Sequence, residues 1–456
     1  MKKFLPISFL FLLTYVGANA QKQLPSNWYY TTLDNGLQLL VIEDNSVPLV
    51  TIEIAVHNGA FTEDSIYNGL SHLYEHMFFK ANKDIPSQEA YLDRVHELGI
   101  VFNGSTDDER VNYFFTMPVS NLDAGLSFMN SAIRYPLFLQ DEMKKEDPVV
   151  DGEFQRAESD PTFRLVQDWN KNMWGDLVTR KNPIGIHEVI LSATPDKMHA
   201  IQNKYYWPNN SLLAIAGNVK HEEVLAKVKA IYGDWKPSDF DPFQKWPIPE
   251  FKPLTADQTF ISLSPNARVP IVLMGWRGPD TRNDVKSTYA ADVFSFILSQ
   301  SSAKFQQELV DSGLALQLQF GYQTSKYVGP IQLFVVPNPQ KLKECMKKVA
   351  DEINQFGSDS YFTDDQLQTA KDQLAISEEY DREKTSQYIH TVTFWWASAS
   401  LDYYTTYIDN LKKVTRQDIK DYVNKYIVGK PMVGGILLSP DMQKSMGISD
   451  FKQLFQ

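Results

Sequence analysis

The chain contains a single cysteine among its 456 residues, Cys345, so no intramolecular disulfide can stabilise it. It also lacks an excess of basic residues: it contains 44 Lys and Arg but 56 Asp and Glu, which gives a formal net charge of -12. Without a basic surface to offset phosphate charge, no nucleic-acid partner is expected. After residue 20 no apolar run is long enough to cross a bilayer, so no stable membrane anchor is expected either.

The one long apolar stretch lies at the start of the chain. Residues 1–20, MKKFLPISFLFLLTYVGANA, combine two lysines, an apolar run and the small residues Ala18 and Ala20 around Asn19. This pattern is typical of a secretory signal peptide cleaved before Gln21, and a retained signal anchor is the weaker alternative. No cysteine follows the cleavage point, so we expect a periplasmic or secreted protein without a lipid anchor.

The length of the chain and its prolines predict two domains. A chain of 456 residues exceeds the size of one hydrophobic core. Between residues 235 and 253 five prolines prevent a regular helix or a central strand. We therefore expect a signal peptide at 1–20, a first domain at 21–236, a linker at 237–253 and a second domain at 254–456.

Similar segments recur at a nearly constant offset, which indicates an internal duplication. VPLVTIEIAV begins at Val47, and VPIVLMGW begins at Val269. TPDKMHAIQNKYY begins at Thr194, and TRQDIKDYVNKYI begins at Thr415. The two offsets agree to within one position, and the segments follow in the same order. We therefore predict that each half is one copy of the same α+β unit.

The alternation of apolar residues predicts the main elements of the first copy. Residues 33–44 and 47–56 alternate like paired strands, and an Asn-Gly turn signal precedes the first of them. A helix is expected over 65–80, a turn and a strand over 103–118, and a second helix over 121–134. This order predicts an α+β fold with an antiparallel type of sheet and helices stacked on one face.

The segment NGLSHLYEHMFFK carries the strongest chemical signal. On a helix His72, Glu75 and His76 share one face, so both imidazoles reach a common point with a carboxylate beside them. A chain with eight histidines is expected to contain H-x-x-E-H by chance only about 0.01 times. A catalytic zinc site needs a third protein ligand. Glu146 and Glu153, which face the same way on a predicted helix, are the candidates for that ligand.

The motif and the segments around it resemble the insulinase/pitrilysin family of zinc peptidases, peptidase family M16. The resemblance rests on H-x-x-E-H, on the interval from His76 to Glu153 in its VV-x-x-E context, and on GLSHLYEHMFF, NGST…NYFF and GLALQLQF. It implies Zn²⁺ held by His72, His76 and Glu153. It also implies that Glu75 acts as the general base and that Glu146 orients a ligand histidine. The fold it implies is two duplicated α/β sandwiches that form half of a clam-shell chamber.

The resemblance also implies where a peptide substrate binds. Asn103 begins the segment that resembles the edge strand of the family, to which an extended peptide adds by backbone pairing. Members of the family usually have Ala after this Asn, whereas this chain has Gly104. The alternative for Asn103-Gly104 is a plain turn.

The second half lacks residues that complete members of the family use. The offset between Val47 and Val269 places Phe294, Ile297 and Leu298 where the first half has its motif, so no second metal site is expected. Complete members also carry an Arg and a Tyr that bind substrate near the zinc of the facing half. In ELVDSGLALQLQF, which is one residue shorter before the glycine, Val310 falls near the place of the Arg and Leu316 takes the position of the Tyr. We therefore expect a heterodimer with a related chain that supplies the Arg/Tyr pair.

Three functions remain open at this point. The first is a secreted zinc endopeptidase acting on peptides or unfolded segments, as the metal-bearing subunit of a heterodimer. The second is a non-catalytic structural or assembly subunit with the same fold. The third is a module that only binds a metal or a peptide. The presence of Glu75, which a simple binder does not need, argues against the third.

Overall fold

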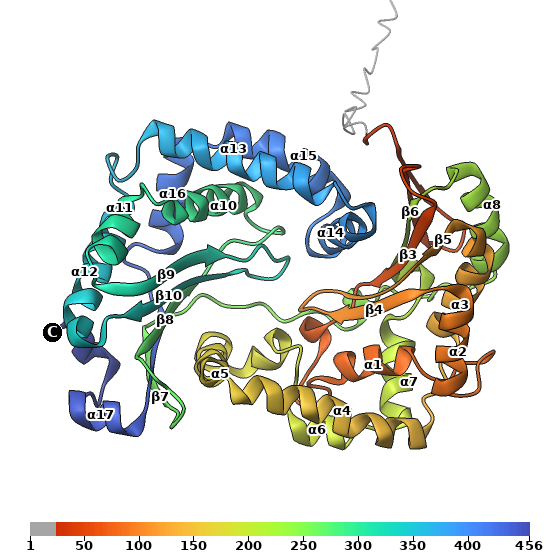
Figure 1. Ribbon diagram of the computed structural model, residues 1–456, viewed down its shortest axis with the longest axis horizontal. Coiled ribbons are helices and arrows are strands. Elements are labelled where there is room, and N and C mark those ends of the chain that lie inside the picture. The colour runs from red at the N-terminus through yellow and green to blue at the C-terminus, as the bar shows by residue number, and fades with distance from the viewer. Residues whose placement is uncertain (1–23) are drawn as a thin grey trace, which may run out of the picture.

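A computed structural model describes residues 24–456 of the chain. The signal peptide predicted at residues 1–20 lies outside the described residues. Two β-sheets, one from each half of the chain, lie on opposite sides of the molecule, and helices line their faces (Figure 1). Within residues 24–456, no helix combines the length and the apolar character needed to cross a membrane.

The first half folds around a six-stranded sheet whose strand order is β1-β2-β6-β3-β5-β4. Neighbouring strands are antiparallel, except that β2 and β6 run parallel. The strands are β1 (Trp28–Thr32), β2 (Gln38–Glu43), β3 (Leu49–Val56), β4 (Val101–Thr106), β5 (Val111–Pro118) and β6 (Ser211–Gly217).

The expectation that the strands at 33–44 and 47–56 pair with each other is wrong, because β6 lies between β2 and β3. Every residue of β6 is buried, and a strand of this kind needs a neighbour on each side. The turn at Asn35-Gly36 instead joins β1 to β2 in a hairpin. The segment expected to begin with a turn at Asn103 forms β4, and its turn follows at residues 107–110.

The helices of the first half are α1 (Leu70–Phe78), α2 (Gln88–Leu98), α3 (Leu122–Arg134), α4 (Gln140–Ser159), α5 (Pro161–Trp174), α6 (His187–Leu191), α7 (Pro195–Tyr205) and α8 (His221–Tyr232). All of them except α5 contribute to the largest core of that half, which lies on one face of this sheet. The short helix α9 (Pro242–Lys245) lies in the proline-rich segment between the two halves.

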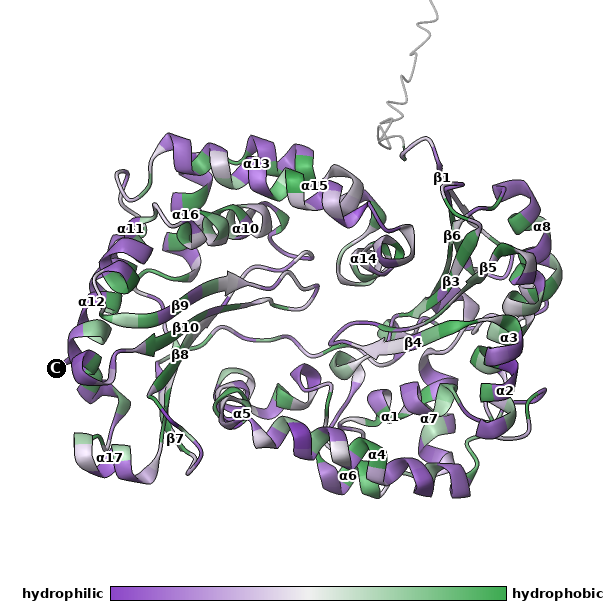
Figure 2. Cartoon of the chain, in the orientation of Figure 1, coloured by the Kyte–Doolittle hydropathy of each residue, from purple (hydrophilic) through white to green (hydrophobic). Residues whose placement is uncertain are grey.

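The second half contains a five-stranded sheet with the order β7-β11-β8-β10-β9. Its strands are β7 (Gln258–Leu263), β8 (Ile271–Arg277), β9 (Ala315–Tyr322), β10 (Pro330–Pro337) and β11 (Val433–Leu438). Its helices are α10 (Val285–Ser299), α11 (Lys304–Gln306), α12 (Leu342–Gln355), α13 (Asp364–Asp381), α14 (Thr385–Ser398), α15 (Leu401–Lys413), α16 (Arg416–Tyr426) and α17 (Pro440–Met446). Helices such as α12 and α13 alternate between hydrophilic and hydrophobic residues, as amphipathic helices on a core do (Figure 2).

The predicted duplication is confirmed by the topology of the two sheets. Without β1, the order β2-β6-β3-β5-β4 in the first sheet matches β7-β11-β8-β10-β9 in the second, and β7 and β11 are again the parallel pair. The offset from the start of β3 to the start of β8 also equals the offset from the start of β6 to the start of β11. The fold is therefore two copies of one α/β sandwich.

The two copies exchange a helix. Helix α5 of the first half packs on β7, β8 and β11, where Leu165, Trp169 and Met173 join a buried cluster with Leu273 and Leu437. Helix α14 of the second half packs in turn on β3 and β6 of the first sheet. Each sheet thus has one face covered by a helix from the other copy, so neither copy buries its sheet alone.

Candidate metal centre

Helix α1 carries the three residues of the H-x-x-E-H motif. The N-cap residue of this helix, Gly69, has a left-handed backbone with φ 90° and no side chain that could accept a capping hydrogen bond. The buried carboxylate of Glu63 supplies the missing acceptor, because its oxygens accept from the backbone N–H of Gly69 and Ser71, both at 2.7 Å. Glu63 therefore fixes the start of the helix that presents His72 and His76.

His72, His76 and Glu153 come together across α1 and α4. The Nε2 atoms of the two histidines lie 3.2 Å apart, and Oε2 of Glu153 lies 3.5 Å from His72 Nε2 and 3.7 Å from His76 Nε2. Tetrahedral zinc with bonds of about 2.0–2.2 Å holds its ligand atoms about 3.3–3.6 Å apart. The three atoms therefore have the spacing that a zinc ion requires, and the two-histidine, one-carboxylate set suits it chemically.

The surroundings of the two histidines differ. Burial and the nearby His76 lower the pKa of His72 to about 4, which keeps its imidazole neutral, the form that binds metal. Among the described residues, its buried Nδ1 has no hydrogen-bond partner. Burial opposes a charge on His76, but the hydrogen bond to Glu146 and the nearby carboxylate charges together outweigh burial and raise the pKa of His76.

Glu146 holds His76 rather than joining the ligand atoms. One carboxylate oxygen lies 2.8 Å from His76 Nδ1, and the other forms an ion pair with Lys80. Burial disfavours the charge of Glu146, yet the bonds from His76 and Lys80 prevail and lower its pKa. A carboxylate that accepts from Nδ1–H directs the lone pair of Nε2 toward the metal position. Sequence reasoning missed Lys80, although it lies at the helical spacing of four from His76.

Glu75 lies beside the ligand atoms, against strand β4. Its Oε2 accepts a hydrogen bond of 2.6 Å from Thr106 Oγ1, and burial raises its pKa. A Cβ added at Gly104 would lie 2.8 Å from Cγ of Glu75, so the glycine leaves room for the carboxylate where the family usually has Ala. Sequence reasoning missed Thr106, which the two-residue period of a strand places on the same side as Gly104.

Asn103 lies in β4, the edge strand of the first sheet, with its side chain exposed. Its backbone pairs with Phe114 of β5 on one side, and the sheet has no further strand on the other among the described residues. The geometry therefore leaves an edge free for an extended chain next to Glu75.

The equivalent helix of the second half cannot bind a metal in this way. Phe294, Ile297 and Leu298 on α10 are each at most 1% exposed and belong to the core of that half. Their side chains also offer no ligand atoms.

A second group of possible ligands, Glu43, His221 and Glu222, has a structural explanation. Glu43 accepts from the backbone N–H and from Nδ1 of His221, both at 2.8 Å, and from Lys220. These contacts satisfy the N-terminus of α8 and leave a cation in the cluster, which opposes metal binding.

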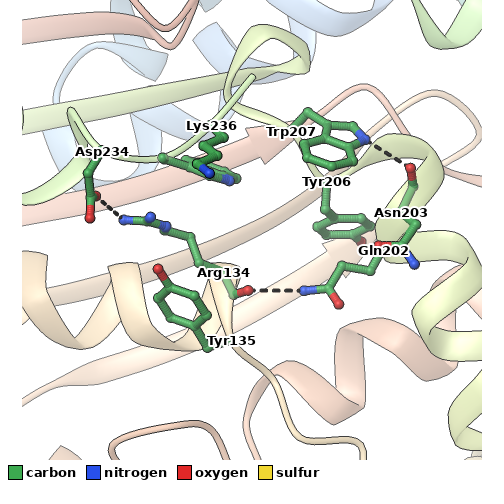
Figure 3. A pocket seen from close by; sticks show the side chains of 9 residues that line it. Arg134, Tyr135, Gln202, Asn203, Tyr206, Trp207, Asp234 and Lys236 are labelled. Atoms are coloured by element: carbon green, nitrogen blue, oxygen red, sulfur yellow. Dashed lines mark hydrogen bonds and ion pairs between the residues drawn. The ribbon is translucent and has the colours of Figure 1, made fainter. Parts of the chain in front are cut away.

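A hollow of about 440 Å³ lies at the carboxyl ends of α3 and α7 (Figure 3). Arg134 and Asp234 form an ion pair of 2.7 Å across it, and Gln202 donates to the backbone of Arg134. None of the candidate site residues lines this hollow. It is therefore separate from the metal centre.

Two family models match the chain. The model described as Insulinase (Peptidase family M16) matches residues 39–179, and the model described as Peptidase M16 inactive domain matches residues 192–374. All the candidate metal residues lie within the first match, and the buried apolar positions of α10 lie within the second.

Several curated relatives carry names of zinc proteases. The zinc protease PqqE of Helicobacter pylori is 25% identical over 357 residues, which cover 76% of this chain and 78% of that protein. An uncharacterized zinc protease of Rickettsia felis is 23% identical over 332 residues, which cover 72% of this chain and 78% of that protein.

Solved structures share the fold over most of the chain. A protease from Helicobacter pylori has a TM-score of 0.79 at 20% identity and covers 90% of this chain and 99% of its own. The first half of the periplasmic protease PqqL from Escherichia coli has a TM-score of 0.73 at 18% identity and covers 93% of this chain and 94% of its own. At these identities the similarity establishes the fold alone.

Proposed function

Because the chain belongs to the insulinase family of peptidases (peptidase family M16), we propose that it is a zinc-dependent endopeptidase. The observation that carries the proposal is the spacing of three ligand atoms, 3.2–3.7 Å, on His72, His76 and Glu153. When bound there, zinc would supply a Lewis acid and a water of lowered pKa.

The residues around the metal position have separate roles in this proposal. Glu75, which is not a ligand, accepts the proton of the attacking water and passes it to the leaving amine. The burial that raises its pKa makes it a stronger base than an exposed carboxylate. Glu146 fixes the tautomer and orientation of His76. Peptides or unfolded segments bind in extended form along β4, where Asn103 contacts them. This binding takes place inside a closed chamber, and this chain forms one half of the chamber.

The partner in this proposal is a related M16 chain. Leu316 is 57% exposed on β9, the edge strand of the second sheet, and Val310 lies just before that strand. Neither side chain can donate a hydrogen bond. In other hydrolases each donor that stabilises the developing oxyanion contributes about 3–4 kcal/mol. A partner that supplies the Arg/Tyr pair would complete the site in a heterodimer.

The alternative function is a non-catalytic structural or assembly subunit. It is less favoured because the candidate metal residues and Glu75 are all present and grouped. The proposal also keeps the predicted domain limits at 21–236 and 254–456. It places the protein in the periplasm or outside the cell, on the grounds of the predicted signal peptide and of relatives such as periplasmic PqqL.

The test combines metal analysis with cleavage of quenched peptides by the mature chain, alone and with a related chain that carries the Arg/Tyr pair. We expect about one zinc per chain and turnover that chelators abolish. Glu75→Gln should keep the zinc and lose turnover, because the base is removed and the ligands are not. Wild-type turnover by Glu75→Gln would refute the mechanism. Full activity without any partner would refute the heterodimer.

A further inference from the structure

The turn between β4 and β5 binds the second half of the chain. Glu109 in this turn is only 3% exposed, and its two carboxylate oxygens accept from the backbone N–H of Lys326 and Tyr327, both at 2.8 Å. Lys326 and Tyr327 lie in the connection between β9 and β10. The tips of the two equivalent hairpins of the duplicated fold are therefore joined through one buried carboxylate.

Arg110 binds the same turn to helix α14. Its Nη1 donates to the backbone oxygen of His390 at 2.7 Å and to Oγ1 of Thr393 at 2.9 Å. Its Nη2 donates to Asp107 within the turn at 2.9 Å. The turn is thus held by two elements of the second half, the β9–β10 connection and α14.

The strand that leads into this turn touches Glu75. Thr106, the last residue of β4, donates to Oε2 of Glu75 at 2.6 Å, and it lies in the same short segment as Glu109. Gly104, on the same side of β4, also lies against Glu75, since a Cβ added there would be 2.8 Å from Cγ of Glu75. The contact between the halves and the contact with Glu75 therefore both involve β4 and its turn.

We propose that Thr106 is a positioning residue for Glu75, and that Glu109 keeps Thr106 in place by binding the β4–β5 turn to the second half. This inference rests on the proposed function, in which Glu75 is the general base. A hydrogen bond to one carboxylate oxygen limits rotation of the side chain and leaves the other oxygen to take the proton. Because a misplacement of about 1 Å can cost about a hundredfold in rate, the second half then contributes to catalysis without touching the metal position.

The first test compares substitutions of Thr106 in the zinc-loaded full chain, with the related partner chain where turnover needs it. Thr106→Val keeps the shape and removes the hydroxyl, and Thr106→Ser keeps the hydroxyl. We expect Thr106→Val to lower kcat about tenfold or more, with KM within about twofold and zinc content unchanged. Thr106→Ser should stay within about threefold of the wild type. The matched control is Thr51→Val, which removes a buried hydroxyl bonded to Thr116 in the same sheet and should leave kcat unchanged.

The second test removes the link to the second half. Glu109→Gln replaces one acceptor oxygen by an amide donor, and Glu109→Asp, which keeps the charge on a shorter side chain, serves if Glu109→Gln does not fold. Hydrogen exchange of the amides at residues 101–106 should become at least about tenfold faster, and kcat should fall as in Thr106→Val. Glu352→Gln, a change of a fully buried glutamate in α12, should leave this exchange unaltered.

The double variant Thr106→Val/Glu109→Gln distinguishes positioning from general destabilisation. If both residues act through the same contact, its kcat should be close to that of Thr106→Val alone. The positioning role would be overturned if the kcat losses of the two single variants multiplied in the double variant. It would also be overturned if Thr106→Val had the same kcat as the wild type or as Thr106→Ser. Unchanged exchange at 101–106 in the Glu109 variant would overturn the link. Loss of the proposed function looks different, because the wild type itself would then show no turnover while the exchange result still decides the link.

Discussion

Glu146→Gln offers the sharpest test of how the candidate metal centre is built. Glu146 and Lys80 form an ion pair in which the side chains are 9% and 5% exposed. Removing the carboxylate charge leaves Lys80 buried without its counter-ion, and breaking a buried pair in this way costs about 3–5 kcal/mol. We therefore expect the metal-free Glu146→Gln variant to lose about that much free energy of unfolding.

The same substitution should also weaken zinc binding, for a separate reason. His76 Nδ1 loses its carboxylate acceptor, and loss of such a partner costs about 10–100-fold in metal affinity, or about 1.4–2.7 kcal/mol. Chemical unfolding of the metal-free protein measures the first effect, and zinc titration against a competing chelator measures the second. Adding Lys80→Met should restore most of the stability and leave the zinc affinity low, because the stranded charge is gone and the acceptor is still missing.

Glu142→Gln is the matched control for this prediction. Glu142 lies on the same helix and is equally buried, but it accepts only from the backbone N–H of Ala81 and Gln88. Its substitution should cost about 1–2 kcal/mol and leave zinc affinity unchanged. If Glu146→Gln matched the wild type in unfolding free energy to within the error of the measurement, or bound zinc equally well, the roles given to Lys80 and Glu146 would be wrong.

Three further predictions concern other parts of the molecule. Glu153→Ala should lower zinc occupancy measured by metal analysis, and equal occupancy would mean that another carboxylate is the ligand. Trp169→Ala should destabilise the chain by about 3–5 kcal/mol in chemical unfolding, because the ring packs against Gly275 in the second sheet, and a loss below about 1 kcal/mol would contradict the helix exchange. Burial opposes the charge of Glu53, but the hydrogen bonds and positive charges of its partners, chiefly His390 and Arg110, together prevail and lower its pKa below the usual 4.5. The free energy of unfolding that ionised Glu53 contributes is therefore present above about pH 4.5 and lost as the pH falls further. Glu53→Gln should flatten this part of the curve of unfolding free energy against pH.

The sequence predicted the features that depend on spacing along the chain. The motif on α1 was visible because three residues at helical spacing share one face. The duplication was visible because the segments at Val47 and Thr194 recur at Val269 and Thr415 with nearly the same offset. In both cases the information lies within one element or in a comparison of two segments, so no knowledge of the tertiary structure was needed.

Contacts between distant segments were not predictable in the same way. Strand β6 separates β2 from β3, although helices α1 to α7 all lie between β3 and β6 in the sequence. Pairing of this kind depends on which strands have two apolar faces to bury. The apolar sequence of β6 predicts a buried strand but does not identify the two strands next to it. The exchange of α5 and α14 was hidden for the same reason, because an amphipathic helix does not reveal which sheet it covers.

The two copies of the motif helix show why only one of them can carry a site. Helix α10 packs against α13, α15 and α16, and its residues at the motif positions lie in the core of the second half. Polar groups at those positions would be buried without partners, at a cost of several kcal/mol each. Helix α1 instead faces β4 and α4, where His72 and His76 keep 17% and 15% of their side chains exposed and Glu146, Glu153 and Thr106 supply partners. The chemistry of the first copy therefore depends on what covers the helix as much as on the motif itself.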